Sequence, residues 1–272
     1  MKKIVYLISA LVTLSFTNQA QNDTMYIMKA GAIKAKYHLT NQVDSIIFYK
    51  PTFSTNGNIF NPNLTYGAVN DQEGNTYKTI AIGTQTWMAE NLRSTKYSDG
   101  KNIPIVKDNT QWSNSSNNKS PMMSWYNNDQ ATFTANKYGA LYNWYAVSPT
   151  TNGNKNVCPT GWHLPTDAEW TTLIDYLGGE GVAGGKMKST GTQYWSSINT
   201  GATNESGFSG LPGGNRNNYG TFNGIGSYGS WWSSMEDGTV SAWLRHLYYD
   251  SSNAYRNGTN KNLGYSVRCL ED

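Results

Sequence analysis

The sequence predicts an α+β domain in which two helices come early and short antiparallel strands come late. Two observations support this class. Residues 166–177 show the apolar spacing and the start signals of a helix, whereas the sequence after Gly178 consists of short strand-like runs separated by glycine. The 272 residues are enough for one or two domains, and no repeat of solenoid length is present.

The first residues resemble a secretory signal peptide, which we place at residues 1–20. Lys2 and Lys3 precede an apolar stretch, 4–14, that is too short to span a bilayer comfortably. An uncleaved membrane anchor is the alternative. No cysteine lies near the cleavage region, so lipid attachment there is excluded. We therefore expect an exported protein, in the periplasm, at the cell surface or outside the cell, with no stable membrane span after cleavage.

Residues 21–51 are expected to form a small β module, and residues 52–66 a linker. The module contains strand-like runs at 25–28, 33–37 and 43–49. The linker is rich in Asn, Gly, Ser, Thr and Pro. Strands this short bury little surface, so we expect the module to dock on the main domain or on a partner.

The main domain is expected to span residues 67–272. Its first strands are predicted at 76–82 and 85–88, where apolar residues alternate with polar ones. A polar surface loop is expected at 108–120. A helix is predicted at 138–147, because several large apolar side chains there fall on one side of a helix.

The helix at 166–177 has the clearest signals. Thr166 can cap its first turn and Glu169 can reach back to Thr166, which is a capping box. The apolar side chains that follow recur at helical spacing: Trp170, Leu173, Ile174 and Leu177. We interpret Asp167 and Glu169 as residues that stabilise the start of the helix rather than as an acid–base pair.

The last strands are predicted at 230–235, 240–249 and 263–270. At least one of Trp231 and Trp232 should be buried, because neighbouring residues of a strand face opposite sides. On the 240–249 strand, the same alternation gives two sets: Ala242, Leu244, His246 and Tyr248, against Trp243, Arg245, Leu247 and Tyr249. The second set has more bulk to bury, so we expect the first set to carry His246 and Tyr248 toward solvent.

Cys158 and Cys269 are the only cysteines, so only one disulfide is possible. Export permits such a bond. It would tie the start of the 166–177 helix to the last strand, and closing a loop of roughly 110 residues stabilises a fold by up to about 4.7 kcal/mol. Two buried free thiols are the alternative.

The composition and the histidines argue against several functions. Charged residues make up 14% of the chain and no basic run stands out, so nucleic acid is a poor candidate partner. His38, His163 and His246 are not at metal-ligand spacing, and His163 is expected to be a buried structural residue. No serine lies in a nucleophile elbow. We therefore expect no enzyme activity and no cofactor, although a structural calcium ion in the Asn/Asp-rich loops stays open.

Five motifs occur in order along the main domain: WMAENL at 87–92, YGALYNW at 138–144, CPTGWHLP at 158–165, GFSGLPGG at 207–214 and GYSVRC at 264–269. Together they resemble the Fibrobacter succinogenes major paralogous domain family, over about 67–272. The resemblance implies a C-type lectin-like fold and a distant relation to formylglycine-generating sulfatase-modifying enzymes. The 25–51 segment resembles a leader module of exported Bacteroidetes proteins. The family has no settled biochemical activity.

The chain departs from the active-site patterns of these relatives. The enzymes use a cysteine pair shortly before the closing segment, where this chain reads Tyr255-Arg256-Asn257-Gly258, and Asn257 cannot perform thiol chemistry. The calcium-dependent sugar-binding motifs of C-type lectins, Glu-Pro-Asn or Gln-Pro-Asp followed by Trp-Asn-Asp, are also absent. The resemblance therefore implies neither activity.

Residues 213–262 concentrate Tyr, Trp, Asn, Ser and Arg, a composition typical of antibody-like binding surfaces. The stretch is also similar to the variable region of retroelement-diversified receptors. We expect one exposed surface that binds a glycan or a surface protein through Asn215, Arg216, Asn218, Tyr219, His246, Tyr248, Tyr255 and Asn257. A structural or adhesion component of the cell surface is the alternative function.

Overall fold

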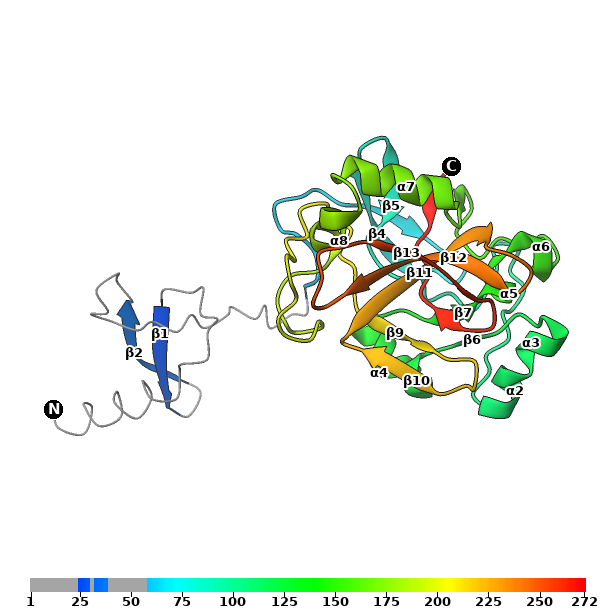
Figure 1. Ribbon diagram of the computed structural model, residues 1–272, viewed down its shortest axis with the longest axis horizontal. Coiled ribbons are helices and arrows are strands. Elements are labelled where there is room, and N and C mark those ends of the chain that lie inside the picture. Colours follow the sequence, from blue (N-terminus) through cyan, green and yellow to red (C-terminus); the bar gives the residue numbers. More distant parts are fainter. Residues whose placement is uncertain (1–23, 30–31, 39–57) are drawn as a thin grey trace. The chain divides into compact units, whose positions relative to one another are not determined.

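The computed structural model describes residues 24–29, 32–38 and 58–272 (Figure 1). The chain divides into two compact units, Met1–Asn56 and Gly57–Asp272.

The first unit contains an antiparallel hairpin made of β1 (Thr24–Lys29) and β2 (Ala32–His38). In its register Thr24 lies opposite His38 and Met25 opposite Tyr37. These are two of the strands predicted for the N-terminal module. The third predicted strand, at 43–49, and the signal peptide lie outside the described residues.

A five-stranded sheet brings the beginning and the end of the second unit together. Its strand order is β3 (Gly67–Asn70), β4 (Thr76–Ile82), β5 (Gln85–Met88), β15 (Leu270–Glu271) and β8 (Trp162–His163). All neighbours are antiparallel. The two strands predicted at 76–82 and 85–88 are therefore confirmed.

A second five-stranded sheet crosses the middle of the unit. Its order is β10 (Phe222–Ile225), β9 (Gly213–Arg216), β14 (Gly264–Tyr265), β7 (Leu141–Asn143) and β6 (Met123–Ser124), again with antiparallel neighbours. Together with the helices, these sheets confirm the predicted α+β class.

The third sheet has three strands, β11 (Tyr228–Glu236), β12 (Ser241–Tyr248) and β13 (Tyr255–Asn260), in that order. The strands predicted at 230–235 and 240–249 are β11 and β12. The register shifts between Trp232 and Glu236, so the pairing is irregular near the turn between the two strands.

Most helices of the second unit are short, and two are longer. The set comprises α2 (Asn109–Ser113), α3 (Ser115–Asn118), the 3-10 helix η1 (Tyr126–Asn128), α4 (Gln130–Ala135), α5 (Trp144–Val147), α6 (Pro149–Asn152), α7 (Asp167–Tyr176) and α8 (Glu180–Met187). Figure 1 shows α7 at one end of the unit and the α2–α3 pair at the other. The segment predicted as a polar loop at 108–120 therefore contains α2 and α3.

Helix α7 forms as its start signals predict. The Thr166 hydroxyl accepts a hydrogen bond from the Glu169 backbone N–H at 3.2 Å, and the Glu169 carboxylate accepts one from the Thr166 N–H at 2.8 Å. The capping box is thus complete. Trp170, Leu173 and Ile174 are buried on the inner side of the helix, as predicted.

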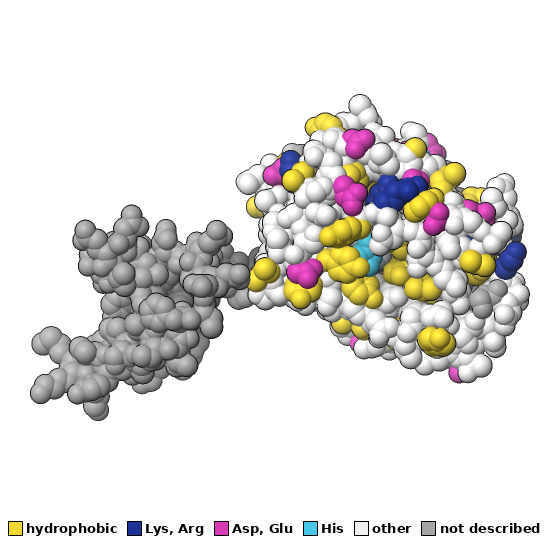
Figure 2. Space-filling model, in the orientation of Figure 1, with side chains coloured by type: hydrophobic (Ala, Val, Ile, Leu, Met, Phe, Trp, Pro, Cys, Tyr) yellow, Lys and Arg dark blue, Asp and Glu magenta, His cyan; other side chains and the backbone are white. Residues whose placement is uncertain are grey.

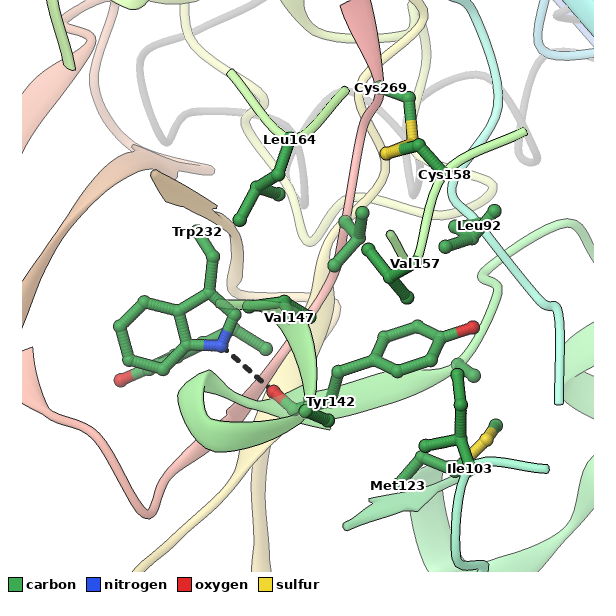
Figure 3. Close-up of a cluster of buried hydrophobic side chains, with 14 of the residues drawn as sticks. Leu92, Ile103, Met123, Tyr142, Val147, Val157, Cys158, Leu164, Trp232 and Cys269 are labelled. Atoms are coloured by element: carbon green, nitrogen blue, oxygen red, sulfur yellow. Dashed lines mark hydrogen bonds between the residues drawn. A yellow bond between two sulfur atoms is a disulfide. The ribbon is translucent and has the colours of Figure 1, made fainter. Parts of the chain in front are cut away.

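Two large apolar clusters meet at β11. Trp231 belongs to one cluster and Trp232 to the other, and both side chains are fully buried. Successive residues of a strand face opposite sides, so β11 separates the clusters. The Trp232 indole N–H donates to the Tyr142 carbonyl at 2.8 Å (Figure 3). The prediction that at least one of these tryptophans is buried is confirmed.

The predicted disulfide joins Cys158 and Cys269, whose Cα atoms are 5.8 Å apart. Both residues are buried in the same cluster as Trp232 and Tyr142 (Figure 3). The bond links the segment just before β8 to the segment just before β15, across 111 residues of sequence. Two free thiols are thereby excluded.

Two predicted elements are wrong in type or extent. The 138–147 segment is not one helix but β7 followed by α5, and its positions from Ala140 onward are all buried. When every residue of an apolar run is buried, the spacing of its apolar residues does not distinguish a helix from a strand. The 263–270 strand is split into β14 and β15, which pair in different sheets.

The compact unit begins at Gly57 rather than at residue 67. Ile59 and Phe60 are buried in the cluster that contains Trp231. The Asn204 side-chain amide donates to the Ile59 carbonyl at 3.0 Å. The second half of the segment expected to be a linker is therefore part of the folded unit.

Candidate ligand-binding face

The three-stranded sheet places four aromatic side chains on one face, which we call the aromatic face: Tyr228, His246, Tyr248 and Tyr255. In the register of the sheet, Tyr228 lies opposite Tyr248, and His246 lies opposite Tyr255. The three tyrosines are half-exposed, whereas His246 is buried. Figure 2 shows hydrophobic side chains gathered over these strands.

The four rings contact one another in a continuous series. The ring centroids of Tyr228 and His246 are 4.9 Å apart, those of His246 and Tyr248 4.2 Å, and those of Tyr248 and Tyr255 5.6 Å. Such spacings are those of favourable aromatic pairs. The rings therefore hold one another in place and form a preorganised surface.

Hydrogen bonds hold the phenol groups at the two ends of this series. The Tyr228 hydroxyl donates to the Asn215 side-chain oxygen at 2.8 Å. The Tyr255 and Ser251 hydroxyl groups lie 3.1 Å apart. Burial raises the pKa of Tyr228 and of Tyr248, so both phenols stay neutral.

His246 forms the floor of the aromatic face. Its Nδ1 lies 2.7 Å from the Ser230 hydroxyl, and its Nε2 is buried with no hydrogen-bond partner in the described part of the chain. Burial lowers the pKa of His246 to about 4, so the imidazole is neutral near pH 7. The prediction that His246 faces solvent is wrong, because Tyr228 and Tyr248 pack against its ring.

The loop after β12 is held by a buried lysine. The Lys188 ammonium group donates to the carbonyl groups of Thr200, Tyr248 and Ser251 at 2.8 to 2.9 Å. Burial lowers the pKa of Lys188 to about 8. Lys188 follows α8 directly, so this helix positions the loop that leads from Tyr248 to Tyr255.

Helix α8 packs directly against this loop. A Cβ atom on Gly184 would lie 2.1 Å from the Asn253 carbonyl oxygen, so only glycine permits the contact. The Gly185 backbone N–H donates to the Ser252 carbonyl at 3.0 Å. These contacts keep the loop beside the aromatic face in a defined shape.

Arg216 was predicted to be exposed and is fully buried. Its guanidinium group donates to the Gly220 carbonyl at 2.8 Å and to the Lys107 carbonyl and the Asn109 side chain at 3.0 Å. It also stacks on Trp112, with 4.4 Å to the ring centroid. Arg216 therefore joins β9 to the segment that leads into α2, and it cannot contact a ligand at the surface.

The other predicted site residues divide into two groups. Asn215 is buried, contrary to the prediction, but contacts the aromatic face through Tyr228. Asn257 is exposed on β13, two residues from Tyr255 and on the same side of the strand. Asn218 and Tyr219 lie in the turn between β9 and β10, where Tyr219 is 72% exposed. Among the described residues, no ring contact joins Tyr219 to the aromatic face.

The prediction missed Tyr228 and Ser230 as parts of the face. Alternation along β12 correctly placed His246 and Tyr248 on one side. The register of β11 against β12 could not be predicted, because the bulge near Glu236 shifts the pairing.

The opposite face of the sheet is charged. Asp167 forms ion pairs with Arg245 at 2.6 Å and with Arg256 at 2.9 Å. The Arg256 guanidinium lies 3.4 Å from the centroid of the Trp243 ring. Asp167 thus links α7 to β12 and β13, in addition to its place in the first helical turn.

His163 is one-third exposed rather than buried. It lies between Glu169, at 3.1 Å, and Asp272, at 2.7 Å. Burial opposes ionisation of Glu169, but hydrogen bonds from Thr166 and His163 outweigh it and hold the pKa of Glu169 below its usual value. Glu169 therefore stabilises the start of α7 and also contacts His163, which in turn contacts Asp272.

The described residues contain no group of three or more His, Cys, Asp or Glu side chains that could hold a metal ion. Within the same residues, no helix has the length and apolar character needed to cross a membrane.

Comparison with known proteins adds one finding. The family model of the Fibrobacter succinogenes major domain matches residues 80–271. The match covers the capping box, both cysteines and the whole aromatic face. No curated protein and no solved structure matches the chain.

Proposed function

We propose that this chain, which belongs to the Fibrobacter succinogenes major domain family, is an exported, non-catalytic binding protein. Its ligand is a glycan or a surface protein, and the aromatic face is its binding site. The Cys158–Cys269 disulfide supports export to the periplasm, the cell surface or the extracellular space. The same disulfide, with β5 and β15 paired in one sheet, supports a C-type lectin-like fold.

The observation that carries this proposal is the set of half-exposed rings on one sheet face. Tyrosine rings give a large contact area and lose little conformational entropy on binding. Tyr228 and Tyr255 are also held by hydrogen bonds from their hydroxyl groups. A surface prepared in this way binds a ligand without a large reorganisation cost.

Several features favour binding over catalysis. Cys158 and Cys269 are bonded to each other, so neither supplies the free thiol of the sulfatase-modifying enzymes. Asn257 takes part in β13, where those enzymes require a cysteine. Asp167 and Glu169 are occupied by ion pairs and by the capping box.

The proposal is tested with Tyr248→Ala and Tyr255→Ala combined in the full-length chain. Removing two adjacent aromatic contacts should weaken binding by roughly thirtyfold or more, since the loss of a single hot-spot residue already costs about 2 kcal/mol or more. A glycan array and a surface-protein extract supply the ligands. The matched control is Tyr176→Ala, because Tyr176 is a 65% exposed tyrosine on α7, away from the aromatic face.

Thermal unfolding should show that both variants keep the fold. Normal binding by the double variant would refute the aromatic face as the site.

A structural or adhesion role is the second candidate, because the first unit has its own hairpin. Deleting residues 21–56 distinguishes the two functions: ligand capture should survive the deletion if the aromatic face is the binder, whereas a structural role predicts loss of assembly alone.

A further inference from the structure

We infer that the aromatic face binds a neutral saccharide, and that a hydroxyl group of this saccharide forms a hydrogen bond with Nε2 of His246. The inference rests on the binding function proposed above and specifies its ligand class.

The first observation is the unpaired nitrogen. His246 is 8% exposed, its Nδ1 is engaged by Ser230 at 2.7 Å, and its Nε2 has no partner among the described residues. Buried polar atoms are nearly always paired, so an unpaired one requires an explanation. The rings in contact with His246 belong to Tyr228 and Tyr248, which are half-exposed. The ligand hydroxyl would reach Nε2 by displacing the edge of one of these two rings, while the other rings of the aromatic face stay in place.

The second observation concerns the chemistry that Nε2 can accept. The Ser230 hydroxyl can donate to Nδ1 or accept from it, so both neutral tautomers of His246 are compatible with this contact. Nε2 is a donor in one tautomer and an acceptor in the other. A ligand hydroxyl satisfies either case, because it can both donate and accept. A carboxylate can only accept and an ammonium group can only donate.

The third observation concerns the groups beside the rings of the aromatic face. Among the described residues, no Lys or Arg side chain lies over the rings of Tyr228, Tyr248 or Tyr255. The side chains that bond to their hydroxyl groups are uncharged, namely the Asn215 amide and the Ser251 hydroxyl, and the Asp250 carboxylate acts on Tyr248 through space. Aromatic faces beside uncharged hydrogen-bonding groups suit sugar rings. A stable protein interface buries about 800 Å² on each partner, which a face of four rings alone does not supply.

Isothermal titration calorimetry of the full-length chain provides the test, with cellohexaose, laminarihexaose, mannohexaose and xylohexaose as probes. At least one should bind. His246→Phe keeps a ring in place but removes Nε2, and should weaken that binding about threefold to tenfold. His163→Phe is the matched control, since it makes the same exchange at a histidine that contacts Glu169 and Asp272 and lies outside the aromatic face; its affinity should stay within about twofold of the original.

A second readout covers the case in which His246→Phe does not fold. Imidazole nitrogen NMR of the unmodified chain should show the Nε2 resonance of His246 move on addition of the bound oligosaccharide. An unchanged Nε2 resonance, or equal affinity of the folded His246→Phe variant, would overturn the role of His246. Binding to none of the four probes, or capture of a protein instead, would overturn the saccharide assignment. A different result would refute the proposed function itself, namely normal ligand binding by the variant that combines Tyr248→Ala and Tyr255→Ala.

Discussion

Arg216 on β9 and His246 on β12 are polar residues, and both are buried. Arg216 satisfies its guanidinium group with backbone carbonyls and one amide side chain. His246 satisfies Nδ1, whereas its Nε2 has no hydrogen-bond partner among the described residues. Arg216 therefore has a purely structural set of contacts, and His246 does not. Burial lowers the pKa of both residues, to about 10 for Arg216 and about 4 for His246.

The lowered pKa of His246 predicts a pH-dependent stability. In the unfolded chain the imidazole titrates near 6.5, and in the folded chain near 4. Between these values the unfolded state binds the proton and the folded state does not, so stability falls as pH falls from 6.5 to 4. At pH 5 the loss should be about 2 kcal/mol.

Urea unfolding of the original chain and of His246→Phe, at pH 7 and pH 5, measures this effect. The difference in unfolding free energy between the two proteins should change by about 2 kcal/mol between the two pH values, while carboxylate titrations cancel. A difference that does not depend on pH would contradict the buried, neutral state of His246.

The residues of the site show what composition can and cannot predict. The Tyr- and Asn-rich stretch contains the four rings of the aromatic face, and alternation grouped His246 with Tyr248. Neither signal could show that Arg216 is buried, because its partners at Val106 to Asn109 are far away in sequence. Burial of a polar side chain depends on such distant partners, which local pattern does not contain.

At the scale of elements, α8 acts on the aromatic face through the loop between β12 and β13. Lys188 binds three carbonyl groups, two of them at Tyr248 and Ser251. Gly184 and Gly185 allow the helix to approach the backbone of the same loop. The loop is thus fixed from one side by a single short helix.

Lys188→Met should therefore loosen the loop between Tyr248 and Tyr255. The substitution leaves carbonyl groups without a donor, which should cost about 1 to 3 kcal/mol of unfolding free energy. Amide hydrogen exchange at 249–254 should accelerate more than elsewhere. Lys186→Met is the control, because Lys186 forms an exposed ion pair with Glu205 that contributes less than about 1 kcal/mol. Equal exchange in both variants would contradict the role of Lys188.

The elements also explain why some predictions succeeded. Helix α7 carries a complete capping box in four consecutive residues, so its signal is local. The 138–147 segment has no such signal: its β7 part is defined by pairing with β6 and β14. Strand pairing over more than a hundred residues cannot be deduced from apolar spacing when every position is buried.

At the scale of the whole molecule, residues 58–66 belong to the domain although their composition resembles a linker. Ile59 and Phe60 are buried, and the Lys78 ammonium group lies 4.4 Å from the centre of the Phe60 ring. The Asn61 side-chain amide donates to the Asn204 carbonyl, and the Asn204 side-chain amide donates to the Ile59 carbonyl, both at 3.0 Å. Scattered apolar residues in a polar segment can thus complete a core that begins elsewhere.

Phe60→Ala in the full-length chain should consequently destabilise the second unit by about 3 kcal/mol, as expected for a large apolar side chain removed from a buried site. Thr65→Ala, at an exposed position of the same segment, should change stability by less than about 0.5 kcal/mol.

Because residues 58–66 contribute to the core, a fragment 57–272 should unfold at the same urea concentration as this unit in the full chain. A fragment 67–272 should unfold at a clearly lower one. Equal midpoints for the two fragments would show that residues 57–66 only cover the surface, and that the core is complete without them.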